Sequence, residues 1–299
     1  MVEITPMGST LRVLRPAANI LAFYDGRVSG KRAYSIGSNW VDDGAYSLGV
    51  CTYAVVDGAD AIVYDTHISM RHAEIIRAHL QEAGVQNVRV VLSHWHLDHI
   101  AGNAVFADCE IIAHRWTKEA MLTHRVAIEA GRHHGMPAIS PLVMPTRIYD
   151  ESLALTVGRI PVELHHVDIH SRDGTMLVLP EQRLLLAGDA LEDTVTYIAE
   201  PAGLTTHLRD LDRMAGWDVG RILPNHGDPD RIAAGGYGKP LISATRDYIE
   251  RLLQARVDSA LRGRALREFV AQELADGSIS YFEPYDAVHR QNLAAVLAL

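Results

Sequence analysis

Short apolar segments of strand length alternate with helical patterns along the first part of this chain. Residues 46–56 and 59–64 are rich in β-branched and aromatic side chains, and Asp57-Gly58 between them predicts a hairpin turn. Apolar residues recur at helical spacing over 69–83, and the apolar run 88–92 predicts a buried strand. The order strand, helix, strand in this part of the chain therefore indicates a βαβ unit.

The second half of the chain repeats this order and then becomes helical. Further short strands are expected at 110–113, 153–157, 160–164, 175–179, 183–187 and 221–223, with helices over 114–130 and 205–216. Beyond a Gly-rich break at 235–240, helical patterns cover about 241–257, 263–275 and 285–297. We therefore expect an α/β catalytic domain over residues 1–238 and a helical extension over 239–299 that packs on the same domain. Strands followed by helices, twice, are compatible with two sheets packed face to face and helices outside them.

Two segments without a regular pattern are candidates for lining a site. Residues 26–45 are polar and Gly-rich, and residues 131–147 contain three prolines. Long loops in compact domains are often functional. His133 and His134 in the second segment are expected to face solvent rather than to bind a metal.

Composition and charge narrow the classes of partner. The chain has 299 residues, of which 48% are hydrophobic, so it is long enough for a well-buried core. A net charge of −9 without a basic run argues against nucleic acid as a partner. No stretch approaches the roughly 20 apolar residues of a membrane helix. A small molecule is therefore the expected partner.

Cysteine content and the amino-terminal residues bear on the compartment. Cys51 and Cys109 are too few for a disulfide framework and are expected to be buried free thiols. No secretory signal is visible in the first residues. These observations favour a cytoplasmic protein. The apolar helices of the extension favour a homo-oligomer.

The densest cluster of metal-binding side chains follows the predicted strand at 88–92. In Ser93-His-Trp-His-Leu-Asp-His99, three histidines and one aspartate lie where a strand ends and a loop begins. Neutral imidazole and carboxylate are good ligands for zinc and similar divalent ions. His94 and His96 can turn to one side of an extended loop, whereas Asp98 and His99 can face a second point nearby. The spacing therefore suits two metal ions held close together.

This His-x-His-x-Asp-His motif resembles the signature of the metallo-β-lactamase-fold hydrolases. Three later segments match the pattern of that family, namely His170 before a serine, Asp189 at the end of Ala-Gly-Asp, and His226 in Pro-Asn-His-Gly. The resemblance covers about residues 45–230 and implies a four-layer αββα sandwich of two mixed sheets with outer helices. One departure is Ile169, where the family has a glycine, and this leaves His165 and His166 as competitors of His170.

Carried over residue by residue, the resemblance implies a dinuclear metal site. His94, His96 and His170 would hold one ion, Asp98, His99 and His226 would hold the other, and Asp189 would bridge them. Zinc is the expected metal, with iron and manganese as alternatives. A water shared by two such ions would be deprotonated near neutral pH, because a single zinc already lowers its pKa to about 7. Asp98 is expected to orient the resulting hydroxide and to pass its proton to the leaving group.

The expected reaction is hydrolysis of an ester, lactone, amide or related bond in a small molecule. β-Lactams and aryl ethers are further candidate substrates. Trp95 and Tyr197 are the expected substrate contacts, although packing of Trp95 into the core is an equal alternative. Lactonases of this family carry a tyrosine closer to the bridging aspartate than Tyr197 is.

Two other classes of function remain as alternatives. Some relatives use an iron site for oxygenation, but their mononuclear members lose part of the second ligand set, which this chain retains. A binder without enzymatic activity would be expected to have lost ligands, and none is missing from the motifs. Nuclease members carry an added clamping domain, for which this chain has no room.

Overall fold

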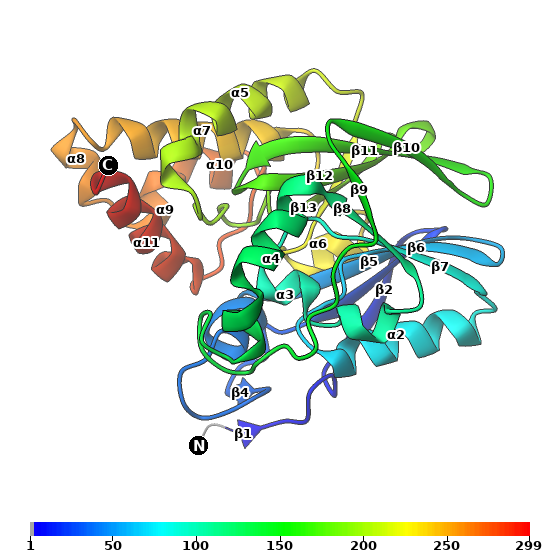
Figure 1. The fold of residues 1–299 in the computed structure, drawn as a ribbon. Coiled ribbons are helices and arrows are strands. Elements are labelled where there is room, and N and C mark those ends of the chain that lie inside the picture. Colours follow the sequence, from blue (N-terminus) through cyan, green and yellow to red (C-terminus); the bar gives the residue numbers. More distant parts are fainter. Residues whose placement is uncertain (1–2) are drawn as a thin grey trace.

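Strands that are buried on both faces form the centre of the molecule. The computed structural model describes residues 3–299 and places two mixed β-sheets face to face between helices (Figure 1). In β3 (Ile20–Asp25) all six residues are buried. Ile20, Ala22 and Tyr24 face the apolar cluster between the sheets, whereas Leu21 and Phe23 face the helices outside. The expected architecture of two mixed sheets with outer helices is confirmed.

The first sheet has seven strands in the order β2–β3–β5–β6–β7–β8–β9. Besides β3, its strands are β2 (Arg12–Ala17), β5 (Val50–Asp57), β6 (Asp60–Tyr64), β7 (Asn87–Val91), β8 (Glu110–His114) and β9 (Arg147–Tyr149). The strands from β2 to β6 pair antiparallel, and those from β6 to β9 pair in parallel. Helix α2 (Met70–Glu82) connects β6 to β7 and packs Ala73, Ile76 and Leu80 against the outer face. The predicted βαβ unit is therefore present.

The second sheet has five strands in sequential order. They are β10 (Ser152–Val157), β11 (Ile160–Ile169), β12 (Ser171–Leu179), β13 (Leu184–Gly188) and β14 (Arg221–Pro224), antiparallel except for the parallel pair β13–β14. β11 and β12 are longer than predicted, because their ladder continues through polar residues such as His166, which pairs with Thr175. Helix α5 (Leu204–Ala215) lies against β11 on the outer face.

The remaining elements before residue 240 are short, apart from the 15-residue helix α4. They are β1 (Glu3–Ile4), β4 (Lys31–Arg32), η1 (Val41–Ala45), α1 (Tyr46–Leu48), α3 (Leu97–Ile100), η2 (Asn103–Phe106), α4 (Arg115–Glu129), η3 (Pro180–Gln182), η4 (Pro201–Gly203) and α6 (Pro229–Ala233). The predicted strand start at residue 46 is wrong, since α1 and a turn at Gly49 precede β5. Gly49 has a φ of +80°, and a Cβ there would lie 1.9 Å from Tyr24 Oη. Only glycine fits this turn without displacing its neighbour.

The long predicted loop at 26–45 is ordered by one buried carboxylate. Asp42 accepts hydrogen bonds from the backbone N–H groups of Ala33, Tyr34 and Ser35, at 2.5, 3.1 and 3.0 Å. Trp40 Nε1–H donates to the carbonyl of Pro137 at 2.9 Å, which joins this loop to the irregular segment before β9. The two segments predicted to line a site are therefore in contact.

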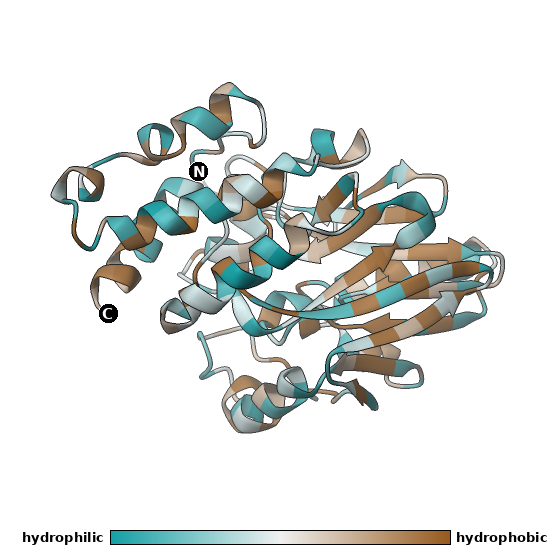
Figure 2. Cartoon of the chain, turned by 90° about the horizontal axis from the view of Figure 1, so that it is seen from above, coloured by the Kyte–Doolittle hydropathy of each residue, from teal (hydrophilic) through white to brown (hydrophobic). Residues whose placement is uncertain are grey.

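The carboxyl-terminal residues form α7 (Pro240–Gln254), α8 (Ser259–Arg262), α9 (Leu266–Phe269), α10 (Ala271–Ala275) and α11 (Tyr285–Leu297). The single helix predicted over 263–275 is wrong, because the backbone leaves helical geometry at Val270, where both Phe269 and Val270 are buried. α7 packs on α5, and α11 packs on α7 (Figure 1). Figure 2 shows hydrophobic residues concentrated along the strands, whereas these helices mix hydrophobic and hydrophilic positions. The domain boundary at residue 238 stays a prediction.

Neither cysteine forms a disulfide bond in the structure. Cys51 and Cys109 are unpaired, and Cys51 is buried in β5, whereas Cys109 is half-buried just before β8. Among residues 3–299, no helix has the length and apolar character needed to cross a membrane.

Replacing a large side chain between the sheets should cost stability. Leu186 in β13 is fully buried in the cluster between the sheets. Leu186→Ala is expected to lower the free energy of unfolding by about 2–5 kcal/mol, since it removes apolar contacts and leaves a cavity. The control is Val126→Ala on α4, where the side chain is 71% exposed and an effect within about 0.5 kcal/mol is expected. Denaturant titration of both variants checks this, and equal stabilities would contradict the assigned packing.

Candidate metal centre

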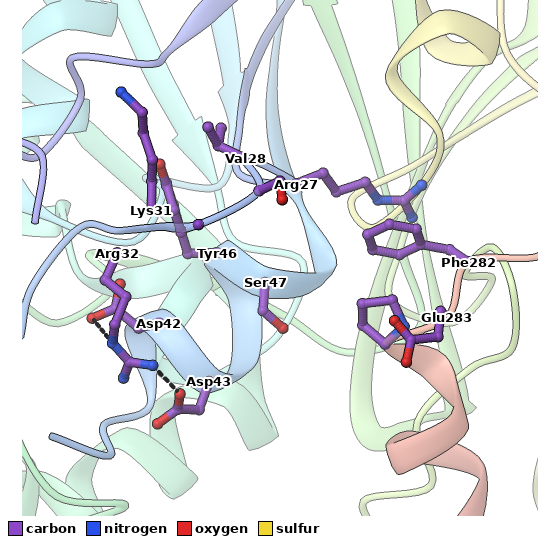
Figure 3. Close-up of a pocket in the computed structure, with 13 residues that line it drawn as sticks. Arg27, Val28, Lys31, Arg32, Asp42, Asp43, Tyr46, Ser47, Phe282 and Glu283 are labelled. Carbon is purple, nitrogen blue, oxygen red and sulfur yellow. Dashed lines mark hydrogen bonds and ion pairs between the residues drawn. The ribbon is translucent and has the colours of Figure 1, made fainter. Parts of the chain in front are cut away.

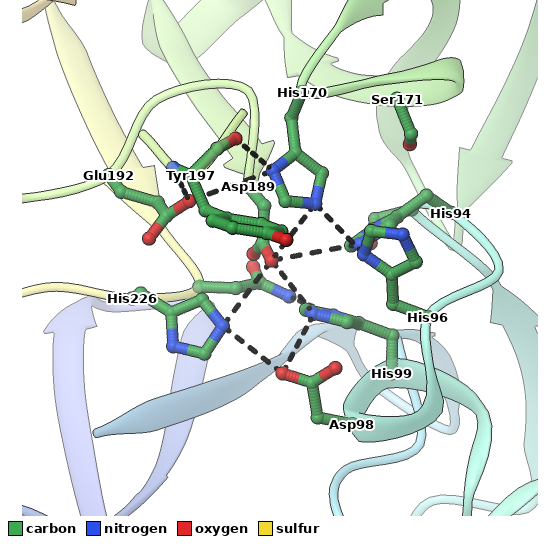
Figure 4. A network of polar contacts seen from close by, with 12 residues as sticks. His94, His96, Asp98, His99, His170, Ser171, Asp189, Glu192, Tyr197 and His226 are labelled. Carbon is green, nitrogen blue, oxygen red and sulfur yellow. Dashed lines mark hydrogen bonds and ion pairs between the residues drawn. The ribbon is translucent and has the colours of Figure 1, made fainter. Parts of the chain in front are cut away.

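The ends of four strands bring the seven predicted ligands to one edge of the two sheets. The His94–His99 segment follows β7, His170 lies between β11 and β12, Asp189 follows β13, and His226 follows β14. Their side chains converge (Figure 4) in two groups, each with ligand atoms within 4.8 Å of one another. The groups are His94, His96 and His170, and Asp98, His99, Asp189 and His226. This is the division into two sets that the sequence motifs suggest, with Asp189 in the second set.

One oxygen of Asp189 lies at the centre of both groups. Asp189 Oδ2 is 3.1 Å from His99 Nε2 and 3.3 Å from His226 Nε2 in its own group. It is also 3.6 Å from His94 Nε2 and 3.8 Å from His170 Nε2 in the other group. A single carboxylate oxygen therefore reaches imidazoles of both sets, as a bridging ligand must.

Backbone geometry explains how Asp189 reaches this position. Gly188, just before it, has a φ of +53°, and a Cβ there would lie 3.0 Å from the Ser93 Cβ. The close approach of β13 to the segment after β7 thus requires glycine. His170 is a non-glycine residue at a φ of +67°, in the tight turn between β11 and β12. Strained residues of this kind concentrate at functional sites.

Two buried atoms of the cluster lack hydrogen-bond partners among residues 3–299. They are His94 Nε2 and Asp189 Oδ1. A buried polar atom without a partner costs on the order of 1–3 kcal/mol, so such atoms are rare in stable proteins. Both belong to residue types that ligate divalent metals, and both lie in the cluster of ligands. The donor set therefore fits a bound cation.

Three of the histidines are oriented by hydrogen bonds on the side away from the cluster. His99 Nδ1–H donates to Asp65 Oδ2 at 2.9 Å, and His226 Nδ1–H donates to the Gly49 carbonyl at 2.6 Å. His170 Nδ1–H donates to the Tyr197 carbonyl at 2.8 Å. Each bond places the proton on Nδ1 and leaves the Nε2 lone pair for a metal.

Asp65 supports two ligands and was missed by the sequence analysis. Its carboxylate accepts from the Ser93 backbone N–H and Oγ–H, both at 2.6 Å, and from Asn225 Nδ2 at 2.5 Å. Ser93 Oγ in turn lies 2.9 Å from His94 Nδ1. Asp65 thus orients His99 directly and His94 through Ser93. The sequence could have identified Asp65, because it directly follows β6, at the same sheet edge as the motif that follows β7.

The protonation of the ligands differs between the two groups. Burial, with the neighbouring imidazoles, lowers the pKa of His94 and brings that of His96 to about 3, so both are neutral. Burial also disfavours the charged form of His99 and His226, but the surrounding carboxylates, of which Asp189 acts most strongly, together outweigh burial and raise the pKa of both. A metal in the second group would therefore displace protons when it binds.

Glu192 is a second acidic residue that the sequence analysis missed. Its side chain is buried, with Oε1 3.8 Å from His170 Nδ1. Oε1 accepts from the Tyr197 N–H at 2.9 Å, and Oε2 accepts from Tyr285 Oη–H at 3.1 Å. Burial and the charge of Asp189 raise the pKa of Glu192 to about 8. Glu192 lies on the Nδ1 side of His170, whereas His170 Nε2 points to the cluster.

The two predicted substrate contacts have different surroundings. The Trp95 ring stacks on His124, with ring centroids 4.7 Å apart, and is tilted against His133 at 5.1 Å. Trp95 also packs against the apolar cluster outside the seven-stranded sheet. Tyr197 is 38% exposed, and its ring projects toward the ligands (Figure 4). Tyr197 is the more exposed of the two, although Trp95 also lines a cavity, together with Trp116 and His124.

The other histidines considered as possible ligands lie outside the cluster. His165 pairs with Glu163, and His166 donates to the Arg172 carbonyl, so neither competes with His170. His133 belongs to neither group of ligands, as expected, but it is partly buried beside Trp95 rather than fully exposed to solvent. His134 is exposed, as expected.

A cavity of about 570 Å³ lies between the loop after β3 and the segment before α11 (Figure 3). Its walls come from the 27–47 segment and from residues 282–284 before α11. Arg27 Nε–H donates to the Leu48 carbonyl at 2.7 Å, and its guanidinium lies 4.0 Å from the centre of the Phe282 ring. Leu48 precedes Gly49, whose carbonyl holds His226. The predicted 26–45 loop therefore lines a cavity, and none of the seven predicted ligands is among the residues that line it.

Comparisons with known proteins agree with this arrangement. The sequence profile of the Metallo-beta-lactamase superfamily matches residues 47–226. A linear primary-alkylsulfatase from Pseudomonas sp. (strain ATCC 19151) is 21% identical over 266 residues, which cover 75% of this chain and 50% of that protein. This chain thus spans about half the length of that relative.

Solved structures with a similar fold include two metallo-β-lactamases. The enzyme from Pontibacter korlensis gives a TM-score of 0.61 at 14% identity, over 80% of this chain and 99% of that one. The DIM-1 metallo-β-lactamase gives 0.59 at 18% identity, over 81% of this chain and 97% of that one. At such identities the similarity establishes a shared fold.

Removing the charge of Asp65 should weaken metal binding. Asp65→Asn keeps the shape of the side chain, but an amide cannot accept all the hydrogen bonds that the carboxylate accepts. We expect metal affinity to fall about 10- to 100-fold, as for other residues that orient metal ligands. Zinc titration against a chromophoric chelator measures this. Asp57→Asn, which changes a carboxylate paired with the exposed Arg159, is the control and should bind zinc like the wild type.

Proposed function

Because this chain belongs to the metallo-β-lactamase superfamily, we propose that it is a metal-dependent hydrolase with a dinuclear centre. The observation that carries the proposal is the position of Asp189 Oδ2, within 3.8 Å of imidazole nitrogens from both groups of ligands. The unpartnered His94 Nε2 in the same cluster supports it. Zinc is the proposed metal, since imidazole and carboxylate ligands suit it.

Each ion would have its own set of ligands. His94, His96 and His170 would hold one ion, and Asp98, His99 and His226 would hold the other. Asp189 would be shared. When bound, the two ions would supply a water that is deprotonated near neutral pH and would polarise the bond to be cleaved.

Asp98 is the residue of this chain placed to handle the proton. Its side chain is 19% exposed, against 5% for Asp189, so it borders the space open to substrate. Asp98 Oδ2 lies 3.3 Å from His226 Nε2, within the second group. We infer that Asp98 accepts the proton of the attacking water and returns it to the leaving group.

The proposed substrate is a small molecule with an ester, lactone, amide or related bond. The relatives' names mention an alkylsulfatase and β-lactamases, so this fold serves more than one bond type, and a sulfate ester joins the candidates. Tyr197, with its exposed ring beside His170, is the proposed substrate contact. Cytoplasmic location and a homo-oligomeric state stay predictions.

Removing one ligand should abolish activity. His96→Ala is expected to lower bound zinc from two ions per chain to one and to reduce turnover at least about 100-fold. The measurements are elemental analysis and hydrolysis of a panel of chromogenic esters, lactones, alkyl sulfates and β-lactams, with and without chelator. His134→Ala, an exposed histidine, is the control. Hydrolysis that resists chelation, or wild-type turnover in His96→Ala, would refute the proposal, and one redox-active iron per chain would favour oxygen chemistry instead.

Substrate binding should depend on the hydroxyl of Tyr197. Tyr197→Phe is expected to raise KM about 2- to 10-fold, the effect of one hydrogen bond, and to leave metal content unchanged. The control is Tyr149→Phe, whose hydroxyl donates to Thr175 Oγ1 within the fold. An unchanged KM for every substrate that the wild type hydrolyses would remove Tyr197 from the substrate site.

A further inference from the structure

The segment that follows Asp189 is held on one side by the carboxyl-terminal helices. We propose that α11 positions the metal ligand His170, and that it does so through Asn292 and the backbone on either side of Tyr197. This inference rests on the proposed metal centre, because it assigns to the helical extension a role in metal binding. Asn292 would be a positioning residue, since its hydrogen bonds go to the backbone on either side of Tyr197 and to Tyr248.

A single buried amide fixes both sides of Tyr197. Asn292 is fully buried. Its Oδ1 accepts from the Ile198 N–H at 2.8 Å, and its Nδ2–H donates to the Thr196 carbonyl at 2.9 Å. Nδ2 also lies 3.1 Å from Tyr248 Oη on α7, which fixes the amide in turn. The peptide groups before and after Tyr197 are therefore tied to α11.

The backbone of Tyr197 in turn orients His170. The Tyr197 carbonyl accepts from His170 Nδ1–H at 2.8 Å. His170 lies alone in the turn between β11 and β12, so the strand pairing around it fixes its backbone, and this bond fixes the rotation of its ring. His170 Nε2 then lies 2.9 Å from His96 Nδ1, in the group that would hold one ion. A shift of the Tyr197 peptide would rotate Nε2 out of that group.

A second link joins the same segment to the extension. Tyr285, at the start of α11, donates its hydroxyl to Glu192 Oε2, and Glu192 Oε1 accepts the Tyr197 N–H. Thr194 Oγ1 donates to the Ser280 carbonyl at 2.7 Å and accepts from the Phe282 N–H at 3.0 Å. Both the amide and the carbonyl of Tyr197 thus depend on residues within or next to the extension.

Loss of the Asn292 hydrogen bonds should lower the metal affinity of one site and leave that of the other nearly unchanged. Asn292→Leu keeps a similar volume but can neither accept from Ile198 nor donate to Thr196. Residues that orient metal ligands typically change affinity 10- to 100-fold, so we expect a fall of about 10-fold for the ion held by His94, His96 and His170. The ion held by the second group should keep its affinity within about 3-fold. Tyr285→Phe should show the same selectivity with a smaller fall.

The experiment is a zinc titration of each full-length variant against a chromophoric chelator, repeated with cobalt(II). The visible absorption of bound cobalt reports the ligand geometry at each site. A general loss of stability would not change the spectrum of one site and leave that of the other unchanged. Leu266→Ala is the matched control, because it removes buried packing in α9 without a bond to the Tyr197 segment. Gln291→Leu, on the exposed side of α11, controls for the change to leucine.

We expect Asn292→Leu and Tyr285→Phe to bind the ion at the first group of ligands more weakly and the other ion normally. Both controls should bind both ions with wild-type affinity. Wild-type affinities in both test variants would overturn the inference, as would an equal loss in Leu266→Ala. If Asn292→Leu fails to fold, the comparison of Tyr285→Phe with the controls decides. A wild-type protein that binds no zinc or cobalt would instead overturn the proposed function itself.

Discussion

The arrangement of this structure depends on a buried carboxylate surrounded by imidazoles. Burying an ionised aspartate is costly unless opposite charges or donors surround it. Asp189 lies among four histidines, and it raises the pKa of two of them, His99 and His226, so that these two supply the opposite charge. Those histidines come from three different strand ends, so both sheets must be docked for the cluster to form. A second layer of acceptors, including Asp65 and the carbonyls of Gly49 and Tyr197, then fixes the rings. The geometry is therefore prepared before any metal binds.

The sequence predicted the ligands better than it predicted their supports. His94, His96, Asp98 and His99 form a spaced motif after an apolar strand, and such local patterns can be read directly. Asp65 and Glu192 are single acidic residues whose roles arise from contacts 28 and 93 positions away, to Ser93 and Tyr285. No local pattern encodes such contacts, because they exist only after the chain has folded.

Errors in the predicted elements have a similar origin. Apolar runs identified the strands, but β11 and β12 extend beyond theirs, since ladder hydrogen bonds do not require apolar side chains. The predicted helix over 263–275 breaks at Val270, where burial of two neighbouring side chains outweighs helix propensity. The sandwich of two mixed sheets with outer helices followed from the family resemblance rather than from periodicity alone, and the order of the strands was not predicted.

The division of the ligands between the two sheets has a consequence for folding. His94 and His99 follow a strand of the first sheet, whereas Asp189 and His226 follow strands of the second. A cation shared by both sets would crosslink the halves of the sandwich and bind only the assembled native state. Its binding free energy would then add to the stability of the whole fold through mass action. In a cell, the lifetime of this protein would accordingly follow the supply of metal, with the ion-depleted chain the more readily degraded form.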